Sequence, residues 1–244
     1  NPTTLLHPSA LRRAAYSALW LSTGSTLAGP SHLPGPTASL IQSARGRVLE
    51  IGAGSGELIQ YYDPQQVDEV VGIEPAQELV GKLSRNAKRG HGAERYRIIR
   101  ASAEQNSLLP ALEKAGLLEP GWVQEGVFDE IICVRVLCMV PRFEETVEGL
   151  WRLLKPGGRF VICEHGINRW RCQDDVGSFV ARILQAFYES LGWSFWMGDC
   201  HLQRDIEGVF RGVGGGNGWS KVVLELVDGW SVLPYTVGYL VKGY

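Results

Sequence analysis

The sequence predicts an α/β fold: a seven-stranded sheet, mostly parallel with an antiparallel last strand, with helices on both faces. Five short apolar segments alternate with amphipathic segments between residues 46 and 166, which favours βαβ crossovers and parallel strands. Two further apolar segments, 220–230 and 235–243, stand too close together for a crossover helix, so they should form an antiparallel hairpin. With 244 residues and 45% hydrophobic content, the chain has enough apolar surface for one domain over residues 1–244.

The predicted strands and helices follow one another in order. The strands cover residues 46–52, 68–75, 94–101, 128–136 and 158–166, and the helices between them cover 57–62, 76–89, 108–117 and 143–155. An amphipathic helix is expected at 9–22 with Ser9 as its N-cap, because prolines and glycines interrupt the pattern at 28–36. A second amphipathic helix is expected at 174–192, and the run "GVGGGNG" at 212–218 predicts a flexible loop.

Composition and charge exclude several classes of protein. The formal net charge of −2 leaves no basic field for nucleic acid. Five cysteines without a CxxC pair argue against a disulfide framework or structural zinc and favour a reducing compartment. No apolar run is long enough to cross a bilayer, and the first residues lack a charged-then-apolar signal. We expect a cytoplasmic protein, and because the chain begins at Asn1 without Met, it would lie peripherally at a membrane surface if an N-terminal anchor has been trimmed.

The stretch "VLEIGAGSG" places Gly52, Gly54 and Gly56 directly after the first strand. Glycines let the backbone turn sharply and approach a ligand, and the following helix offers unpaired N–H groups. In a dinucleotide dehydrogenase the third glycine comes three residues after the second, whereas here it comes two after. Glu74 ends the second strand, where an acid can accept both ribose hydroxyls. The pattern predicts a bound nucleoside and does not require that it carry a pyrophosphate; the alternative is a tight turn with a surface acid.

These motifs, with "GIEP", "ASAEQ" and "LLKPGGRFVICEHG", resemble the class I S-adenosylmethionine-dependent methyltransferases of type 11 over about residues 40 to 165. The resemblance implies a Rossmann-like fold and S-adenosylmethionine as cofactor. It also implies that the methionine part of the cofactor is contacted by Glu50, Gly52, Ala53, Gly54 and Gly56, and the ribose by Glu74. The adenine would be contacted by Pro75, Ala76, Ser102, Ala103 and Glu104. Beneath the sulfonium would lie Val134 and Arg135.

Within that class, "CVRVLCMV" and "GDCHLQRD" make the chain similar to the methyltransferase-like family of alkyl thiol methyltransferases. That similarity implies a thiol acceptor. Two features depart from the family: residues 1–36 contain no apolar membrane segment, and extra residues lie at 107–126. The departures concern membrane attachment and acceptor identity, not the methyl-transfer core.

His165 and Glu164 are the candidate catalytic residues. They close the fifth strand, at the edge where open α/β sheets bind ligands, so His165 is a candidate to orient or deprotonate an acceptor. The alternative is a histidine bonded to loop backbone. Arg135 is expected to pair with a carboxylate of cofactor or substrate, or with Glu130 or another surface acid.

The cysteines are expected to pack as small apolar residues rather than to react. Cys133 and Cys138 lie on or just after a buried strand, where free cysteines commonly serve as core. A metal site would require Cys133, Cys138, Cys200 and a histidine to converge, and the cysteine arrangement of arsenic-methylating relatives is not evident. We therefore expect no metal.

Two segments outside the core should cover the acceptor. These are a helical lead-in over residues 1–36 and a lid insert over 166–211, which is dense in aromatic residues and precedes the hairpin. Such walls suit a lipophilic small molecule. Asp199 is expected to cap a helix starting near Leu202, and Trp196 to face the acceptor. The candidate substrate residues are Tyr16, Trp20, Met139, Trp196, Cys200 and His201.

The sequence therefore predicts a methyltransferase acting by in-line displacement on a thiol or hydroxyl of a lipophilic small molecule. Three alternatives stay open: an O-methyltransferase of a secondary metabolite, an S-adenosylmethionine-binding scaffold or partner subunit that transfers no methyl group, and a nicotinamide dehydrogenase, which the glycine spacing disfavours. The acceptor and the oligomeric state are not determined by the sequence.

Overall fold

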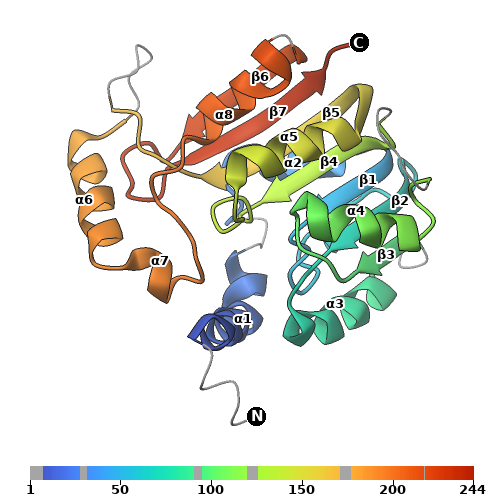
Figure 1. Ribbon diagram of the computed structural model, residues 1–244, viewed down its shortest axis with the longest axis horizontal. Helices are drawn as coiled ribbons and strands as arrows, with labels where there is room; N and C mark the ends of the chain where they lie inside the picture. Colours follow the sequence, from blue (N-terminus) through green and yellow to red (C-terminus); the bar gives the residue numbers. More distant parts are fainter. Residues whose placement is uncertain (1–7, 28–31, 91–94, 120–125, 171–176, 217) are drawn as a thin grey trace.

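The predicted seven-stranded sheet is confirmed. The computed structural model describes residues 8–27, 32–90, 95–119, 126–170, 177–216 and 218–244. Its strands are β1 (Gly46–Ile51), β2 (Val67–Ile73), β3 (Tyr96–Ile99), β4 (Phe128–Val134), β5 (Leu154–His165), β6 (Trp219–Val227) and β7 (Tyr235–Lys242). They lie side by side in the order β3-β2-β1-β4-β5-β7-β6 (Figure 1).

The direction of the strands follows the spacing of the apolar segments. β1 pairs in parallel with both β2 and β4, so the winding reverses between these neighbours, which is where open α/β sheets bind ligands. β7 runs antiparallel between β5 and β6, with Glu164 opposite Thr236 and His165 opposite Tyr235. The C-terminal pair is thus the predicted hairpin, and its last strand is inserted inside the sheet.

Helices cover both faces and one end of this sheet. They are α1 (Pro8–Leu27), α2 (Thr37–Gln42), α3 (Gln77–Arg89), α4 (Gln105–Lys114), α5 (Phe143–Leu153), α6 (Phe179–Ser190), α7 (Trp193–Trp196) and α8 (Ile206–Gly212), with 3₁₀ turns η2 (Ile59–Tyr61) and η4 (Val213–Gly216). None of the described helices has the length and apolar character needed to cross a bilayer.

The core has two main parts, one on each face of the sheet. Apolar side chains of α4, α5 and α8 pack on one face, where Phe160 of β5 meets Phe210 of α8 edge to face at 5.0 Å between ring centroids. Side chains of α2 and η2, including Ile41 and Tyr61, pack on the other face. Successive side chains of β1 point to opposite faces of the sheet, so Leu49 and Ile51 belong to the first part of the core and Val48 belongs to the second.

Several predicted boundaries are wrong. α1 begins before Ser9 and continues to Leu27, and the short helix α2 was not expected. Asp199 does not cap a helix: Asp205 is the N-cap of α8 and accepts from the Gly208 amide, so that helix starts four residues later than expected. The glycine-rich segment at 212–218 carries η4. Residues 174–176, predicted to begin α6, lie outside the described residues.

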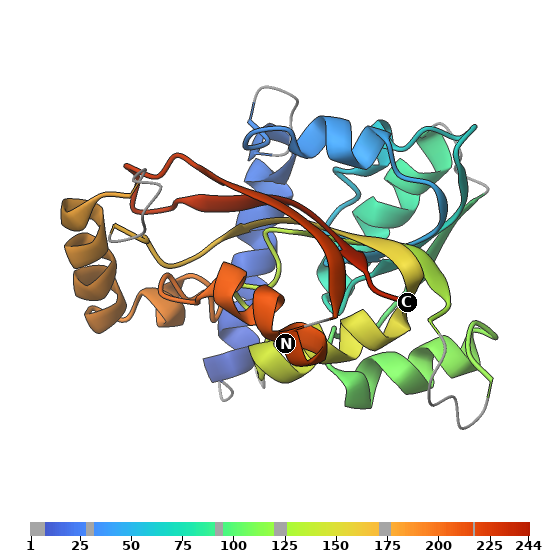
Figure 2. The same cartoon turned by 90° about the horizontal axis from the view of Figure 1, so that it is seen from above.

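α1 and the α6–α7 segment stand at the end of the sheet to which the parallel strands point. Figure 1 shows α1 below the sheet, between α7 and α3, and Figure 2 shows it crossing beneath the strands. Lys82 of α3 donates to the carbonyl of Leu21 at 3.3 Å. On the other side, a Cβ at Gly198 would stand 2.9 Å from Cγ of Tyr16, so only glycine lets the tyrosine pack there. α1 thereby bridges the core and the insert.

Candidate functional site

The glycine loop after β1 is held open by backbone conformations that favour glycine. Gly52, Gly54 and Gly56 have φ values of 72°, 57° and 89°. The amides of Gly52 and Ala53 both donate to the carbonyl of Ile73, at 2.9 and 3.0 Å. These bonds fix the loop against the end of β2 and leave the amides that follow turned toward the same edge.

Glu74 ends β2 and connects directly with this loop. Its carboxylate accepts from the amides of Gly54 and Ala76, each at 2.8 Å, although only 5% of the residue is exposed. Burial raises the pKa of Glu74 to about 7, and the two backbone bonds oppose that shift. A buried acid at the carboxyl end of β2 is the arrangement that holds a ribose.

Glu50 lies on the inner side of the loop. It is fully buried and accepts from the hydroxyls of Tyr62 and Tyr96, each at 2.9 Å. Burial raises the pKa of Glu50 to about 7. Its Oε1 has no hydrogen-bond partner among the described residues, an unsatisfied acceptor of the kind that a bound ligand can complete. The two tyrosines were not predicted, because nothing in their spacing links them to Glu50.

α1 covers the glycine loop through Trp20. A Cβ at Gly54 would stand 2.6 Å from Nε1 of Trp20, and that nitrogen donates to Oε2 of Glu57 at 3.4 Å. Glu57 also accepts from the Ser55 amide at 3.0 Å. Trp20, expected beside the acceptor, therefore lies against the cofactor loop.

The residues expected around the adenine lie beside one another after β3. The Ser102 amide donates to Oγ of Ser107 at 3.1 Å, and Ala103 is buried. Glu104 is engaged at 3.1 Å by Arg142, which turns its carboxylate toward α5. Pro75 is exposed beyond the end of β2.

Val134 ends β4, and Arg135 turns the chain there in a left-handed conformation, with φ of 56°. The guanidinium donates to the carbonyl of His32 at 2.9 Å and lies over the Tyr235 ring at 5.2 Å. The expected pairing with Glu130 is wrong, because Arg159 engages that acid at 2.7 Å.

Beyond this turn, two thiols and an imidazole converge. Cys138, His165 and Cys200 are all buried, and their ligand atoms lie within 4.8 Å of one another. Sγ of Cys200 is 3.1 Å from Nε2 of His165. The hydrogen bond from the Cys138 thiol, followed by that from His165, lowers the pKa of Cys200, while the same thiol bond raises that of Cys138. Cys200 is thus the more readily ionised thiol of the pair.

Backbone bonds hold the three segments together. The His201 amide donates to the Cys138 carbonyl at 3.0 Å, and the Ile167 amide donates to the Arg204 carbonyl at 2.8 Å. Glu164 is fully buried and accepts from the Val136 amide at 2.9 Å, so it positions the turn that carries Cys138. Burial raises the pKa of Glu164 to about 7.

Tyr16 of α1 relates the cluster to the ribose acid. Tyr16 of α1 has a pKa raised above its ordinary range, first by burial and then by the charges of Cys138, Cys200, Glu164 and Glu74. The charges of both groups therefore act on the same hydroxyl. The glycine loop, the buried acid and the cluster form one site at the carboxyl ends of β1, β2, β4 and β5.

Residues 33–197 match a family model described as a methyltransferase domain. The chain belongs to this methyltransferase domain family. S-adenosylmethionine is its methyl donor, and the residues present fit that molecule: the positive-φ glycine loop, the buried Glu74 and the unsatisfied Oε1 of Glu50 stand where a nucleoside and an amino acid would be held.

The methyltransferase is similar to a thiol methyltransferase, a polyketide synthase and an N-methyltransferase. It is 26% identical over 207 residues to human thiol S-methyltransferase TMT1A, covering 82% of this chain and 72% of that protein. It is 30% identical over 133 residues to the highly reducing polyketide synthase easB of Emericella nidulans, covering 48% of this chain but only 4% of the synthase. A solved 1,6-didemethyltoxoflavin N1-methyltransferase of Burkholderia thailandensis, with bound S-adenosylhomocysteine, superposes with a TM-score of 0.56 at 15% identity, covering 95% of this chain and 88% of that one.

The remaining predicted substrate residues of the methyltransferase are only partly brought together. His201 turns away from Cys200 and pairs with Glu189 at 2.8 Å. Trp196 is 76% exposed, and the Met139 amide donates to the carbonyl of Val136. Trp193, which was not singled out, donates from Nε1 to Sγ of Cys200 at 3.4 Å.

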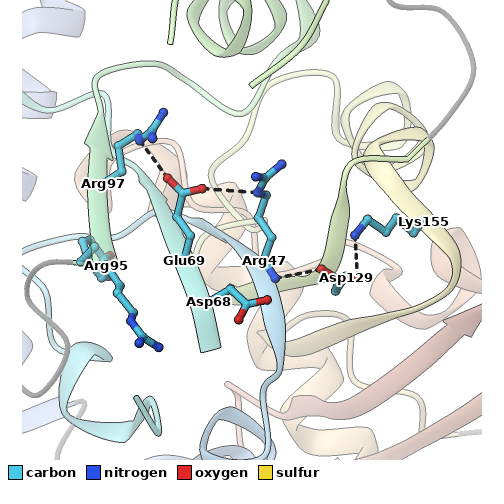
Figure 3. A pocket seen from close by; sticks show the side chains of 8 residues that line it. Arg47, Asp68, Glu69, Arg95, Arg97, Asp129 and Lys155 are labelled. Carbon is cyan, nitrogen blue, oxygen red and sulfur yellow. Dashed lines mark hydrogen bonds and ion pairs between the residues drawn. The ribbon is translucent and has the colours of Figure 1, made fainter. Parts of the chain in front are cut away.

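A separate charged hollow lies at the opposite edge of the sheet (Figure 3). Its lining residues are Arg47, Asp68, Glu69, Arg95, Tyr96, Arg97, Asp129 and Lys155. Glu69 pairs with Arg97 at 2.9 Å and with Arg47 at 3.3 Å, and Lys155 pairs with Asp129 at 2.7 Å. Because these residues stand at the amino ends of the strands, away from Glu74, the hollow is not part of the methyl-transfer site.

Proposed function

We propose that this methyltransferase methylates the thiol of a lipophilic small molecule. The observation that carries the proposal is the position of His165, a buried imidazole 3.1 Å from Cys200 at the carboxyl end of β5. The similarity to a thiol S-methyltransferase over 82% of the chain supports the same acceptor.

The donor supplies a methyl group on a sulfonium, whose thioether leaves without charge. The protein therefore has to align the acceptor and assist its ionisation. A thiol, with a reference pKa of ~8.5, needs only modest help from a neighbouring imidazole or charge. In this proposal His165 is the acceptor-side residue, and Glu164 acts through the turn that it positions.

The lid proposed for the acceptor is made by α1 and the 166–211 insert. Tyr16 packs on Gly198, and Trp193 contacts Cys200, so aromatic surfaces border the thiol cluster from two elements. Phe187 and Phe195 of the insert are about half exposed. Aromatic walls with few polar groups favour an apolar ligand over a charged one.

Two measurements test this function. Transfer of labelled methyl groups to a panel of alkyl thiols and phenols identifies the acceptor, and turnover of phenols alone would show that the thiol assignment is wrong. Calorimetry with S-adenosylmethionine and S-adenosylhomocysteine tests the donor site separately. We expect Glu74→Ala to weaken binding of both, while Glu69→Ala in the opposite hollow leaves it unchanged.

A further inference from the structure

Three side chains of metal-ligand type converge beside the methyl-transfer site. They are Cys138 from the turn after β4, His165 from the end of β5 and Cys200 from the segment before α8, with ligand atoms all within 4.8 Å of one another. A tetrahedral zinc ion, with bonds of ~2.3 Å to sulfur and ~2.0 Å to nitrogen, keeps its ligand atoms ~3.5–3.8 Å apart. Small side-chain rotations would bring the three atoms to those separations.

Burial separates this cluster from a chance meeting of surface residues. Cys138 is 3% exposed, and His165 and Cys200 are each 6% exposed. Nε2 of His165 faces Cys200, whereas its Nδ1 is buried and has no hydrogen-bond partner within the described part of the chain. Nε2 is therefore the nitrogen that would bind an ion shared with Cys200, and that ion would not satisfy Nδ1.

The surroundings hold the three ligands without needing the ion. The bond from the His201 amide to the Cys138 carbonyl joins two of the segments, and Glu164 fixes the turn before Cys138. Trp193, which is not one of the three side chains, donates from Nε1 to Sγ of Cys200. Hydrogen bonds of this kind orient the ligands of metal sites and tune their charge.

We propose that Cys138, His165 and Cys200 bind one Zn²⁺ ion, with the fourth position left for the thiolate of the acceptor. Two cysteines and a histidine with an open position are a ligand set of catalytic zinc. The sequence had suggested no metal, on the premise that Cys133 would have to join; Cys133 packs in the core, and three ligands suffice. The fourth position rests on the thiol specificity proposed above, whereas zinc binding by the three side chains does not.

The reaction at this site balances without a further reagent. An acceptor thiol that coordinates the ion releases its proton to solvent, and its sulfur keeps the electron pair. That sulfur forms a bond to the methyl carbon of the donor while the bond from this carbon to the sulfonium breaks, and the bonding pair stays on the departing thioether. The methylated product is a neutral thioether, a weak ligand for zinc, so it can leave the ion.

Metal content is the first test. After dialysis of the reduced full chain against zinc and then buffer, elemental analysis should give ~1 zinc per chain, falling to below ~0.1 in Cys200→Ala and His165→Ala. Cys163→Ala is the matched control, because Cys163 is a buried free thiol of β5 that is not one of the three proposed ligands. An unmutated chain that binds S-adenosylhomocysteine but retains no zinc would overturn the inference, whether or not the variants fold.

Cobalt(II) tests the open position. Cobalt in place of zinc should give thiolate charge-transfer bands and tetrahedral visible bands, and 2-mercaptoethanol should shift the visible bands. Visible bands that do not respond to the thiol would overturn the assignment of the fourth position. Thiol methylation at an undiminished rate by a zinc-free chain would overturn the assignment of the fourth position and leave the proposed function intact. Zinc and S-adenosylhomocysteine binding without methylation of any thiol would refute the proposed function instead.

Discussion

The carboxylate of Glu74 accepts a hydrogen bond of 2.8 Å from the amide of Gly54, which joins the end of β2 to the glycine loop after β1. The bond sets the conformation of the loop and the direction of the acid at the same time. Both are therefore in place before a nucleoside arrives.

Glu74→Gln should weaken S-adenosylhomocysteine binding by about tenfold to a hundredfold, because a charge-assisted acceptor is replaced by a neutral amide. Calorimetry measures the change. Glu69→Gln should leave the affinity within about twofold, since it removes an acid at the opposite edge. Equal losses in both variants would indicate a general effect of charge.

The stability of the protein should fall as pH rises from about 4.5 to about 7, in part through Glu50. Its folded pKa is about 7 against 4.5 for the free group, so in this window the folded state binds more protons than the unfolded state. Glu50→Gln should remove up to about 3 kcal/mol of this pH dependence. Urea unfolding at pH 5 and pH 7.5 measures the change in the free energy of unfolding between the two pH values, with the exposed Glu113→Gln as control. An equal change in both variants would contradict the assignment to Glu50.

Gly54→Ala should destabilise the protein by about 1–3 kcal/mol through its φ of 57° alone. A second cost arises because the new Cβ would stand 2.6 Å from Nε1 of Trp20. Trp20→Ala should relieve only that second cost, so the double variant measures the contact between α1 and the loop as a coupling free energy. Additive effects of the two substitutions would show that α1 does not press on the loop in solution.

Asp205→Ala should lower the free energy of unfolding by about 1 kcal/mol through loss of the α8 cap. Asp205 also pairs with Arg169. Asp205→Asn separates the two roles, because asparagine keeps the cap but not the charge. Thermal denaturation should rank the asparagine variant close to the unmutated chain; a loss as large as that of the alanine variant would assign the effect to the ion pair.

The sheet could be predicted because its signal is local. Each parallel strand is an apolar run such as that of β1, and the short link between β6 and β7 admits only a hairpin. The same applies to the glycine loop and Glu74, whose spacing follows from the strand ends. The burial pattern of a strand and the conformation of a turn depend on residues that are neighbours in the sequence.

The thiol cluster could not be predicted, since its members come from three separate segments. Cys138 belongs to a turn that starts at the left-handed Arg135, and Cys200 lies in an insert without a regular pattern. Asp199 and Asp205 were equally plausible caps by residue type, and only the start of α8 distinguishes them. The contact of Trp20 with the glycine loop could not be predicted, because the path of α1 depends on its contact with α3.

The insertion of β7 between β5 and β6 bears on how the chain is made. β5 can pair with β7 only after residues 235–242 have left the ribosome, so the strand that carries His165 keeps an open edge from its own synthesis until then. Until then the backbone groups of β5 are available to other chains. Completion of the C-terminal hairpin is thus the event that both closes the sheet and protects the nascent polypeptide from misassembly.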